Sequence, residues 1–316
     1  MGDLLDGSVS GNAVTTAMGD GDIWFPNLGL YLENVPKTFQ IFGVTIALYG
    51  LIIGIGILLA FALMSWSCKK MGVNVDDIYD MGIWLIFFGV LGARAYYVIF
   101  TWDYYKNHLA DIPNIRQGGL AIYGGVIAGL IAEIIWCKVK KKNMFQLGDI
   151  AFQGVLVGQI LGRFGNFTNR EVFGTYTNNL FAMRLPVSAV RSEFIDDAIR
   201  AHMEPGTNYI QVHPTFLYES GYNLGLLILI LLFQKKKAFQ GEVMLWYAGG
   251  YGIGRFIIEG IRTDQLHIKG TNIAVSQMLG LALFIFAIVA DAVVRYKISQ
   301  KKVAENAAKT EEKKTK

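Results

Sequence analysis

The chain has 316 residues, of which 53% are hydrophobic and only 17% are charged, and its mean hydropathy is +0.37. This composition is too apolar for a soluble domain of that length, and the apolar residues occur in runs long enough to cross a membrane. The net charge of +4 is not gathered on a soluble basic face, which argues against a nucleic-acid partner.

The first 40 residues are predicted to form an extracytoplasmic arm. Residues 1–22 are polar and acidic, and they lack the basic start and apolar core of a signal peptide. From Trp24 to Leu32 the segment becomes aromatic and apolar, a composition that favours the membrane–water interface. We therefore expect a disordered tip followed by a segment that lies on the membrane surface.

Seven apolar segments follow and make residues 41–294 a membrane domain. Because backbone polar groups inside a bilayer must pair within the protein, each segment is expected to be a helix. Glycines in the third, fourth and sixth segments would let these helices approach one another closely. The predicted fold class is all-α and integral to the membrane, with seven transmembrane helices over residues 41–65, 80–100, 119–137, 148–166, 215–234, 241–260 and 271–294.

The distribution of lysine and arginine orients the predicted helices. Most of these residues lie in the connections after the first, third and fifth helices and in the basic tail 295–316. By the positive-inside rule that side is cytoplasmic, so the N-terminus lies outside and the C-terminus in the cytoplasm. The long connection 167–214 is then a small extracytoplasmic cap between helices four and five. The tail is expected to be a frayed helix or disordered, and able to contact anionic lipids.

The cysteine and histidine patterns point away from metal chemistry. Cys68 and Cys137 have neither metal-site nor disulfide-framework spacing, and each lies beside lysines at the end of an apolar run. We expect both to be buried thiols. None of the four histidines lies in the middle of a predicted span and no His-x-x-Glu-His spacing occurs, so no metal is expected. The chain also lacks the Gly-x-Ser-x-Gly motif of a serine lipase.

Four polar clusters are predicted to lie toward the outer half of the membrane. A charge at membrane depth is costly, so it usually faces a protein interior or a watery cavity and serves a function. The first cluster, at the outer end of the fourth helix, comprises Arg163, Asn166 and Glu171. In the second, a spacing of four places Tyr251, Arg255 and Glu259 on one face of the sixth helix. Arg262, just beyond that helix, completes this cluster. The third is the glycine-rich stretch 118–125, and the fourth is the stretch 213–219, which opens the fifth helix.

Each cluster has a purely structural alternative. Arg255 and Glu259 could form an ion pair with no other role, and Arg94 could extend to the outer surface. The glycine pairs could serve only helix packing, and His213 could be a hydrogen-bonding residue at a helix start. Two membrane arginines with polar partners on one side nevertheless favour phosphate binding, because arginine holds phosphate in a fork and stays charged. We therefore expect chemistry on a phospholipid headgroup in the outer leaflet.

The stretch 162–171 carries a resemblance to a known family. It reads G-R-F-G-N-F-T-N-R-E and is followed by Gly174, and it resembles the G-R-x-G-N-F-x-N-x-E signature of the prolipoprotein diacylglyceryl transferase family, which has a glycine three positions later. The resemblance extends over nearly the whole chain. Further stretches similar to family motifs occur in the same order, at Phe25-Pro26, Tyr49-Gly50-Leu51, Gly92-Ala93-Arg94, the Gly-Gly opening of the third helix, His213-Pro214-Thr215 with Leu217-Tyr218-Glu219, and Arg255-Phe256 with Glu259, Arg262 and Asp264.

The resemblance implies a reaction in the bacterial plasma membrane, with the active site toward the extracytoplasmic leaflet. The diacylglyceryl group of phosphatidylglycerol would be joined by a thioether to the lipobox cysteine of a preprolipoprotein, with release of glycerol phosphate and without cofactor or metal. The implied catalytic residues are Arg163, Arg255, Tyr251, Tyr123 and Glu259. The implied phosphatidylglycerol-binding residues are Arg163, Asn166, Arg255, Tyr49, Glu171, Arg94 and His213.

One position departs from the family pattern. Many members carry histidine before the glycine pair of the third helix, where this chain has Tyr123. A neutral tyrosine, with a pKa of about 10, is a poor base at pH 7. Either another group helps to deprotonate the thiol, or the field of the arginines lowers the pKa of the incoming cysteine enough that little base is needed.

The main rival interpretation is a secondary transporter that binds an anionic solute through Arg163 and Arg255. The odd number of predicted spans, the lack of a visible repeat and the position of the polar clusters on one side of the membrane argue against it. A seven-span receptor is weaker still, because seven spans alone say little about function.

Overall fold

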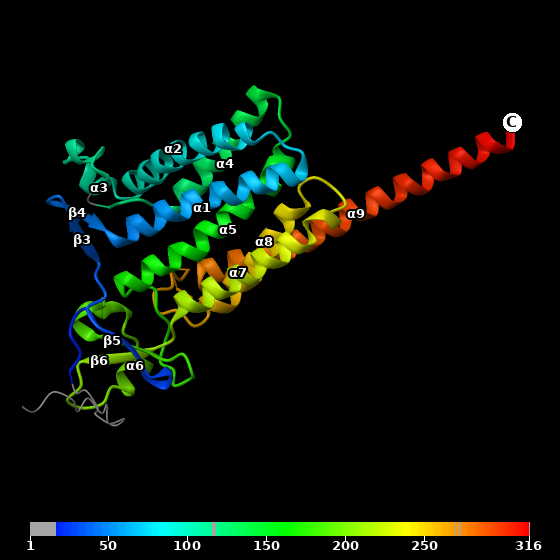
Figure 1. Cartoon of the computed structure of the whole chain (residues 1–316). Coiled ribbons are helices and arrows are strands. Elements are labelled where there is room, and N and C mark those ends of the chain that lie inside the picture. Colours follow the sequence, from blue (N-terminus) through cyan, green and yellow to red (C-terminus); the bar gives the residue numbers. More distant parts are fainter. Residues whose placement is uncertain (1–16, 116–117, 269, 272, 316) are drawn as a thin grey trace, which may run out of the picture. The chain divides into compact units, whose positions relative to one another are not determined.

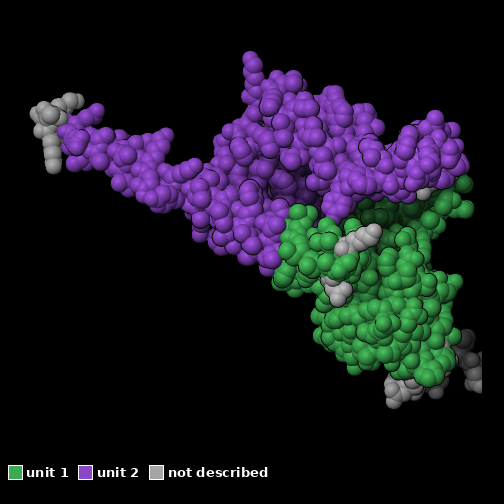
Figure 2. Space-filling model, turned by 180° about the vertical axis from the view of Figure 1, so that it is seen from behind, with its two compact units in different colours: residues 1–53, 161–222, 254–279 green, residues 54–160, 223–253, 280–316 purple. Residues whose placement is uncertain are grey.

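The computed structural model describes residues 17–115, 118–268, 270–271 and 273–315. The predicted disordered tip up to residue 16, together with Arg116 and Lys269, lies outside the described residues. The chain forms two compact units, which Figure 2 colours separately. Unit 1 comprises Met1–Ile53, Leu161–Tyr222 and Gly254–Leu279, and unit 2 comprises Gly54–Ile160, Asn223–Ile253 and Gly280–Lys316.

Unit 1 contains a four-stranded antiparallel sheet that the sequence analysis did not predict. Its strands lie in the order β2 (Leu30–Leu32), β1 (Ile23–Phe25), β5 (Met183–Pro186) and β6 (Tyr209–Val212). Strand β1 pairs with β2 on one side and with β5 on the other. The arm is therefore not only a surface segment, because it supplies two strands to the cap.

One hydrophobic core holds the arm and the cap together. Ile23 and Phe25 of β1 pack with Leu185 of β5 and Ile210 of β6, all of them buried. The short helix α6 (Asp197–Ala201) adds Ile199, and its N-terminus is capped by the Asp196 carboxylate, whose Oδ1 accepts a hydrogen bond of 2.7 Å from the Ile199 amide. Burial alternates along β1, where Ile23 and Phe25 are buried and Trp24 between them is only partly buried, as expected for a strand with one face on a core.

Arg170 anchors the arm to the end of α5 (Met144–Asn169). Its buried guanidinium donates to the carbonyl oxygens of Thr168 at 2.9 Å, Val35 at 2.5 Å and Gly21. Burial lowers the pKa of Arg170, against the opposing charges of Asp22 and Asp20. Because these buried carbonyls need donors, Arg170 couples the fold of the arm to the segment that follows α5.

A hairpin precedes the first long helix. Strands β3 (Thr38–Ile41) and β4 (Val44–Ala47) pair antiparallel through a turn in which Phe42 and Gly43 have φ of +50° and +77°. Helix α1 then runs over Leu48–Met71. The predicted start of the first helix at residue 41 is therefore wrong, because the β-branched residues of 44–46 favour a strand before the apolar helix begins.

Seven long helices make up most of the described chain (Figure 1). Among the described residues, six are long and apolar enough to cross a membrane. The exception is α8, whose 18 residues include Glu242, Arg255 and Glu259. The chain is thus a mostly helical, multi-pass membrane protein. The helices are α1, α2 (Val75–Phe100), α4 (Ile122–Lys140), α5, α7 (Thr215–Phe233), α8 (Glu242–Glu259) and α9 (Val275–Thr315).

The C-terminal tail is helical. Helix α9 continues through the predicted tail as far as Thr315, so the alternative of a disordered tail is wrong. Arg295 pairs with Asp291 at 3.0 Å, one turn before it, and with the buried Glu242 at the start of α8. The first pair supports α9 within one turn, and the second links α9 to the start of α8.

In unit 2, helices α2 and α4 pack side by side (Figure 1). A Cβ added to Gly92 would lie 2.2 Å from that of Ala128, and one added to Gly124 would lie 2.3 Å from the Gly92 carbonyl oxygen. The prediction that glycines let helices approach closely is therefore confirmed for α2 and α4. Cys68 and Cys137 are free, buried thiols, as predicted.

Candidate active site

The end of α5 brings together three of the predicted residues. Arg163 Nη1 donates to Oδ1 of Asn166 at 3.3 Å, and Asn166 Nδ2 donates to Oε1 of Glu171 at 2.9 Å. The chain turns sharply here, because Arg170 and Val172 adopt φ of +57° and +58°. A β-branched residue in the left-handed region is strained, and such strain is typical of functional segments. The turn places Glu171 back over the helix that it follows.

Tyr49, the second residue of α1, lies directly against α5. A Cβ added to Gly165 would lie 1.7 Å from Cδ2 and 2.2 Å from Cε2 of the Tyr49 ring. Only glycine allows the ring to approach the helix backbone this closely. Gly165 of the signature stretch therefore positions a residue that we predicted to bind the headgroup.

The predicted ion pair at the end of α8 is confirmed. Arg255 Nη2 lies 2.5 Å from Oε2 of the buried Glu259, one helical turn later. Beyond the helix, Arg262 binds Asp264 through two contacts of 2.9 and 2.7 Å, and its Nε lies 3.7 Å from Oε2 of Glu259. Burial acts to lower the pKa of Arg262, but the hydrogen bonds to Asp264 and the nearby carboxylates outweigh it and raise that pKa.

Glu219 of α7 lies at the centre of these groups. The sequence analysis placed it in the fourth polar cluster, 213–219, but assigned it no catalytic or binding role. Its Oε2 is 2.7 Å from Nη2 of Arg163. Nη1 of Arg255 is 3.3 Å from both of its oxygens, and Nη1 of Arg262 is 3.5 Å from Oε1. The carboxylate is 4% exposed, and a buried charge requires such partners. A glutamate one turn inside an apolar helix was the available signal.

The charges of this arginine cluster balance. The guanidinium groups of Arg163, Arg255 and Arg262 face the carboxylates of Glu219, Glu259 and Asp264. Within the described part of the chain, Nε of Arg163 and Nε of Arg255 donate to no group. Arg163 is the most exposed member of the cluster, with 19% of its side chain accessible. Asp264 and Arg255 follow at 15% and 14%. The cluster thus offers fixed donors to an anion, and arginine forks suit phosphate.

Backbone pairing ties the three segments of the cluster together. The Gly174 amide donates to the His213 carbonyl at 3.0 Å, the His213 amide donates to that of Thr175 at 3.0 Å, and the Thr175 amide donates to that of Ile261 at 2.9 Å. A Cβ on Gly174 would lie 2.7 Å from the Ile261 carbonyl oxygen. The segments that follow α5, precede α7 and follow α8 are therefore in register.

His213 takes part in a hydrogen-bonded group at the start of α7. Its Nδ1 lies 3.2 Å from the hydroxyl oxygen of Tyr218, which also accepts a 2.9 Å hydrogen bond from Nδ2 of Asn179. Burial lowers the pKa of the His213 imidazole. This geometry favours the helix-start alternative, and a contact of His213 with the headgroup stays a prediction.

Three predicted residues belong to unit 2 and are described within it. Arg94 is buried and does not reach the surface; it donates to the carbonyl oxygens of Ile112, Asp111, Gly118 and Gly119 at 2.7 to 3.0 Å. It therefore holds the loop that leads into α4. Tyr123 lies in the first turn of α4 and is exposed. Tyr251 stacks on Tyr247 with ring centroids 5.6 Å apart.

Comparison with known proteins gives a consistent result. Residues 36–293 match the family model of prolipoprotein diacylglyceryl transferase. Three relatives bear the name phosphatidylglycerol–prolipoprotein diacylglyceryl transferase. The chain is 38% identical to that of Finegoldia magna over 82% of this chain and 94% of the relative. It is 42% identical to that of Lactobacillus acidophilus, over 80% of this chain and 88% of the relative. It is 40% identical to that of Staphylococcus saprophyticus, over 83% of this chain and 90% of the relative.

Proposed function

The chain belongs to the prolipoprotein diacylglyceryl transferase family, and on that premise we propose the reaction that it catalyses. The chain is a transferase. Its substrates are phosphatidylglycerol and the lipobox cysteine of a preprolipoprotein. The cysteine sulfur forms a thioether with the terminal glyceryl carbon of the diacylglyceryl group, the bond from that carbon to the phosphate oxygen breaks, and glycerol phosphate leaves.

The arginine cluster around Glu219 carries this proposal. During the transfer the phosphate group passes from a singly charged diester to a monoester with a second negative charge. Donors fixed at Arg163 and Arg255 stabilise that developing charge more than they stabilise the bound lipid, which is what accelerates a reaction. Asn166 and Tyr251 orient the headgroup in this scheme. Glu219 and Glu259 keep the arginines in place, because both carboxylates are buried against them.

The attacking sulfur is a thiolate. The pKa of a free cysteine is about 8.5 and falls beside cationic groups, so the same arginines favour deprotonation of the incoming thiol. The proton passes to a group of the protein or to water, and Tyr123 and Tyr49 are the candidates for relaying it. Glu171 supports Asn166, whose amide donates to it.

The membrane placement is part of the proposal. Helix α8 also spans the membrane, which brings the number of spans to seven. Its 18 residues are about 27 Å long, and its buried charges pair within the protein rather than face lipid. The N-terminus and the cap of residues 167–214 lie outside, and the basic tail lies in the cytoplasm. The site then opens to the extracytoplasmic leaflet of a bacterial plasma membrane.

A defined assay tests the reaction. Purified protein, phosphatidylglycerol labelled in its headgroup glycerol and a lipobox peptide are expected to give a peptide heavier by one diacylglyceryl group, with labelled glycerol phosphate in the aqueous phase. The variant Arg163→Ala should give neither product while remaining inserted in the membrane. Arg191→Ala, which changes an exposed arginine of the cap, is the matched control.

Two outcomes would contradict the proposal. One is wild-type turnover by Arg163→Ala. The other is the absence of lipidated peptide together with uptake of an anionic solute into vesicles, which would favour the transporter.

A further inference from the structure

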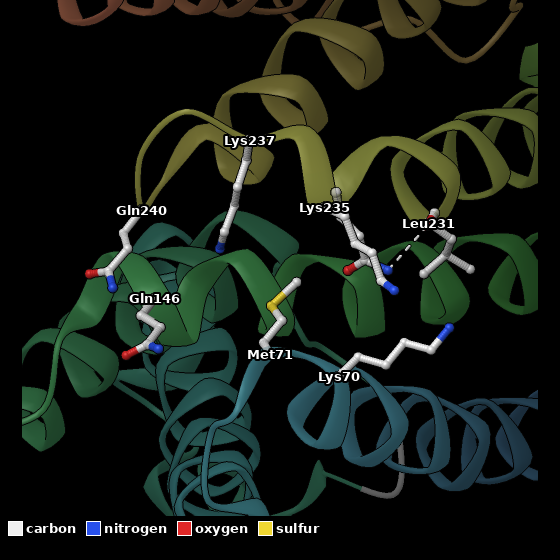
Figure 3. Close-up of a pocket in the computed structure, with 8 residues that line it drawn as sticks. Lys70, Met71, Gln146, Leu231, Lys235, Lys237 and Gln240 are labelled. Atoms are coloured by element: carbon white, nitrogen blue, oxygen red, sulfur yellow. Dashed lines mark hydrogen bonds between the residues drawn. The ribbon is translucent and has the colours of Figure 1, made fainter. Parts of the chain in front are cut away.

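A cavity of about 530 Å³, lined mainly by lysine and glutamine residues, lies in unit 2, where α1 ends and α5 begins. Lys70 lines it from the last turn of α1 and Gln146 from the first turn of α5. Lys235 lines it from the short helix η6 (Gln234–Lys236), and Lys237 and Gln240 line it from the loop that follows. In the view of Figure 3, Lys70 and Lys235 lie on one side of the cavity and the two glutamines on the other. None of these residues belongs to the arginine cluster.

Two of the three lysines keep an unneutralised charge. Lys237 Nζ lies 2.7 Å from Oδ2 of Asp149, which also accepts the Gly241 amide at 3.0 Å. Lys70 lies over the ring of Trp66, with Nζ 3.6 Å from its centroid, and has no carboxylate partner within the described chain. Lys235 makes no hydrogen bond or ion pair there. The cavity therefore presents two ammonium groups that lack an anion.

A buried hydrogen-bond network fixes the base of the cavity. Ser67 Oγ donates to Oε1 of Gln153 at 2.5 Å, and Gln153 Nε2 donates to Oε1 of Gln234 at 3.0 Å. Gln234, which also lines the cavity, donates to the Leu231 carbonyl at 3.3 Å (dashed in Figure 3). Ser67, Gln153 and Gln234 are at most 3% exposed. The network ties α1, α5 and η6 together, so the backbone at Lys70 and Lys235 is held in place.

The location favours a lipid headgroup as the anion. The cavity lies at the ends of α1, α5 and α7, three helices that are long and apolar enough to span a membrane. Trp66 and Phe233, at the same helix ends, are exposed and suit the interface between headgroups and acyl chains. Basic pockets between membrane helices are suited to anionic headgroups, and glutamine amides can bind headgroup hydroxyls.

We propose that this cavity binds the phosphate-bearing headgroup of an anionic phospholipid, with Lys70 and Lys235 on the phosphate and Gln146 and Gln240 on the rest of the headgroup. The site needs only that the chain spans a membrane. It is separate in its residues from the proposed transfer reaction, so either proposal can fail without the other.

Native mass spectrometry of the purified chain with dioleoyl-phosphatidylglycerol tests the site. The double variant Lys70→Gln/Lys235→Gln is expected to retain one phosphatidylglycerol molecule fewer than the wild type. The double variant Lys69→Gln/Lys236→Gln removes the same charge from the neighbouring positions, which do not line the cavity, and should retain as many as the wild type. Lys70→Arg/Lys235→Arg should also bind the lipid. Any phosphatidylglycerol in the arginine cluster is common to all four proteins and cancels in the comparison.

Three results would overturn the proposal. The glutamine variant could retain as many phosphatidylglycerol molecules as the wild type. Dioleoyl-phosphatidylcholine, which has no net charge, could be retained equally well in a lysine-dependent manner. Inorganic phosphate could bind in a lysine-dependent manner without lipid, which would make this a site for a soluble anion.

Discussion

Glu219 lies between the two arginines that we assign to the phosphate. Its Oε2 is 2.7 Å from Nη2 of Arg163, and both of its oxygens are 3.3 Å from Nη1 of Arg255. One buried carboxylate on α7 thus positions side chains of α5 and α8. The arrangement makes the spacing of the two arginines depend on a residue that itself binds no substrate in the proposed mechanism.

We predict that Glu219→Gln lowers kcat/KM for transfer by about 10²-fold, because the amide keeps the shape but removes the charge that holds both guanidinium groups. The lost charge leaves the cluster more positive, so the KM for phosphatidylglycerol should not rise and the loss should fall on kcat. Lipidated peptide measured over a range of phosphatidylglycerol concentrations separates the two constants.

Glu193→Gln is the matched control for that substitution. Glu193 is 67% exposed in the cap, and its oxygen lies 3.9 Å from Arg191, a contact worth little. Its variant should transfer at the wild-type rate. A Glu219→Gln protein with unchanged kcat/KM would show that Glu219 does not set the positions of the arginines.

The apolar helices could be predicted from the sequence, whereas the contacts that build the site could not. Runs of apolar residues located all seven long helices. The predicted first helix began too early because of the hairpin before α1, and α9 continues to Thr315, past the predicted end at residue 294. The sheet was missed because β1 and β2 have only three residues each, too few for an alternating pattern to be recognised.

The candidate site was also predicted only in part, because short-range spacing is visible in a sequence and long-range contacts are not. The pair of Arg255 and Glu259 lies on one helical face, so its spacing is visible in the sequence. The partners of Glu219 come from α5 and α8, far away along the chain. No periodicity encodes such long-range pairing, and the role of Glu219 became apparent only from the folded geometry.

Gly165 should be essential because of its contact with Tyr49. An alanine Cβ would overlap the Tyr49 ring, 1.7 Å from Cδ2, and would move a residue of the headgroup site. We expect Gly165→Ala to lower kcat/KM by about 10²-fold, since a displacement of about 1 Å can have that effect. In a Tyr49→Ala background, where the ring is absent, adding Gly165→Ala should cause no further loss.

Gly162→Ala provides the control on the same helix. A Cβ at Gly162 would meet nothing within 4 Å, so this variant should retain wild-type activity. If Gly165→Ala caused an equal loss with and without the Tyr49 ring, the contact between the two residues would not be the reason for the glycine.

His213 should make stability depend on pH. Burial lowers the pKa of His213 in the folded chain below the unfolded value of about 6.5. As the pH falls below that value, the unfolded chain binds a proton more readily, so this residue destabilises the fold until the pH passes the folded pKa. The melting temperature of the purified protein should therefore fall between pH 7.5 and pH 5.5, values chosen to bracket the unfolded pKa of about 6.5.

Across that range, the melting temperature of the His213→Gln variant should decrease less than that of the wild type. His202→Gln, which removes an exposed imidazole from the end of α6, should follow the wild-type curve. Identical pH profiles for His213→Gln and the wild type would contradict the assignment.

The role of the Tyr123 hydroxyl in deprotonating the thiol can be tested directly. If its hydroxyl relays the thiol proton, Tyr123→Phe should slow transfer at pH 7 by about 10²-fold, the lower end of the range for general acid–base catalysis. The loss should shrink toward pH 9, because a thiol with a pKa of about 8.5 then ionises without help. At pH 7, Tyr123→His should be as active as the wild type and more active than Tyr123→Phe, since an imidazole with a pKa of about 6.5 is a competent base there.

The controls for Tyr123 separate the hydroxyl from the ring. Tyr296→Phe removes an exposed tyrosine hydroxyl from α9 and should leave transfer unchanged at every pH. Full activity of Tyr123→Phe at pH 7 would exclude its hydroxyl from the proton path. Deprotonation would then depend on Tyr49 or on the field of Arg163 and Arg255, and Tyr49→Phe in the Tyr123→Phe background would distinguish these two, because only a relay through Tyr49 requires the second hydroxyl.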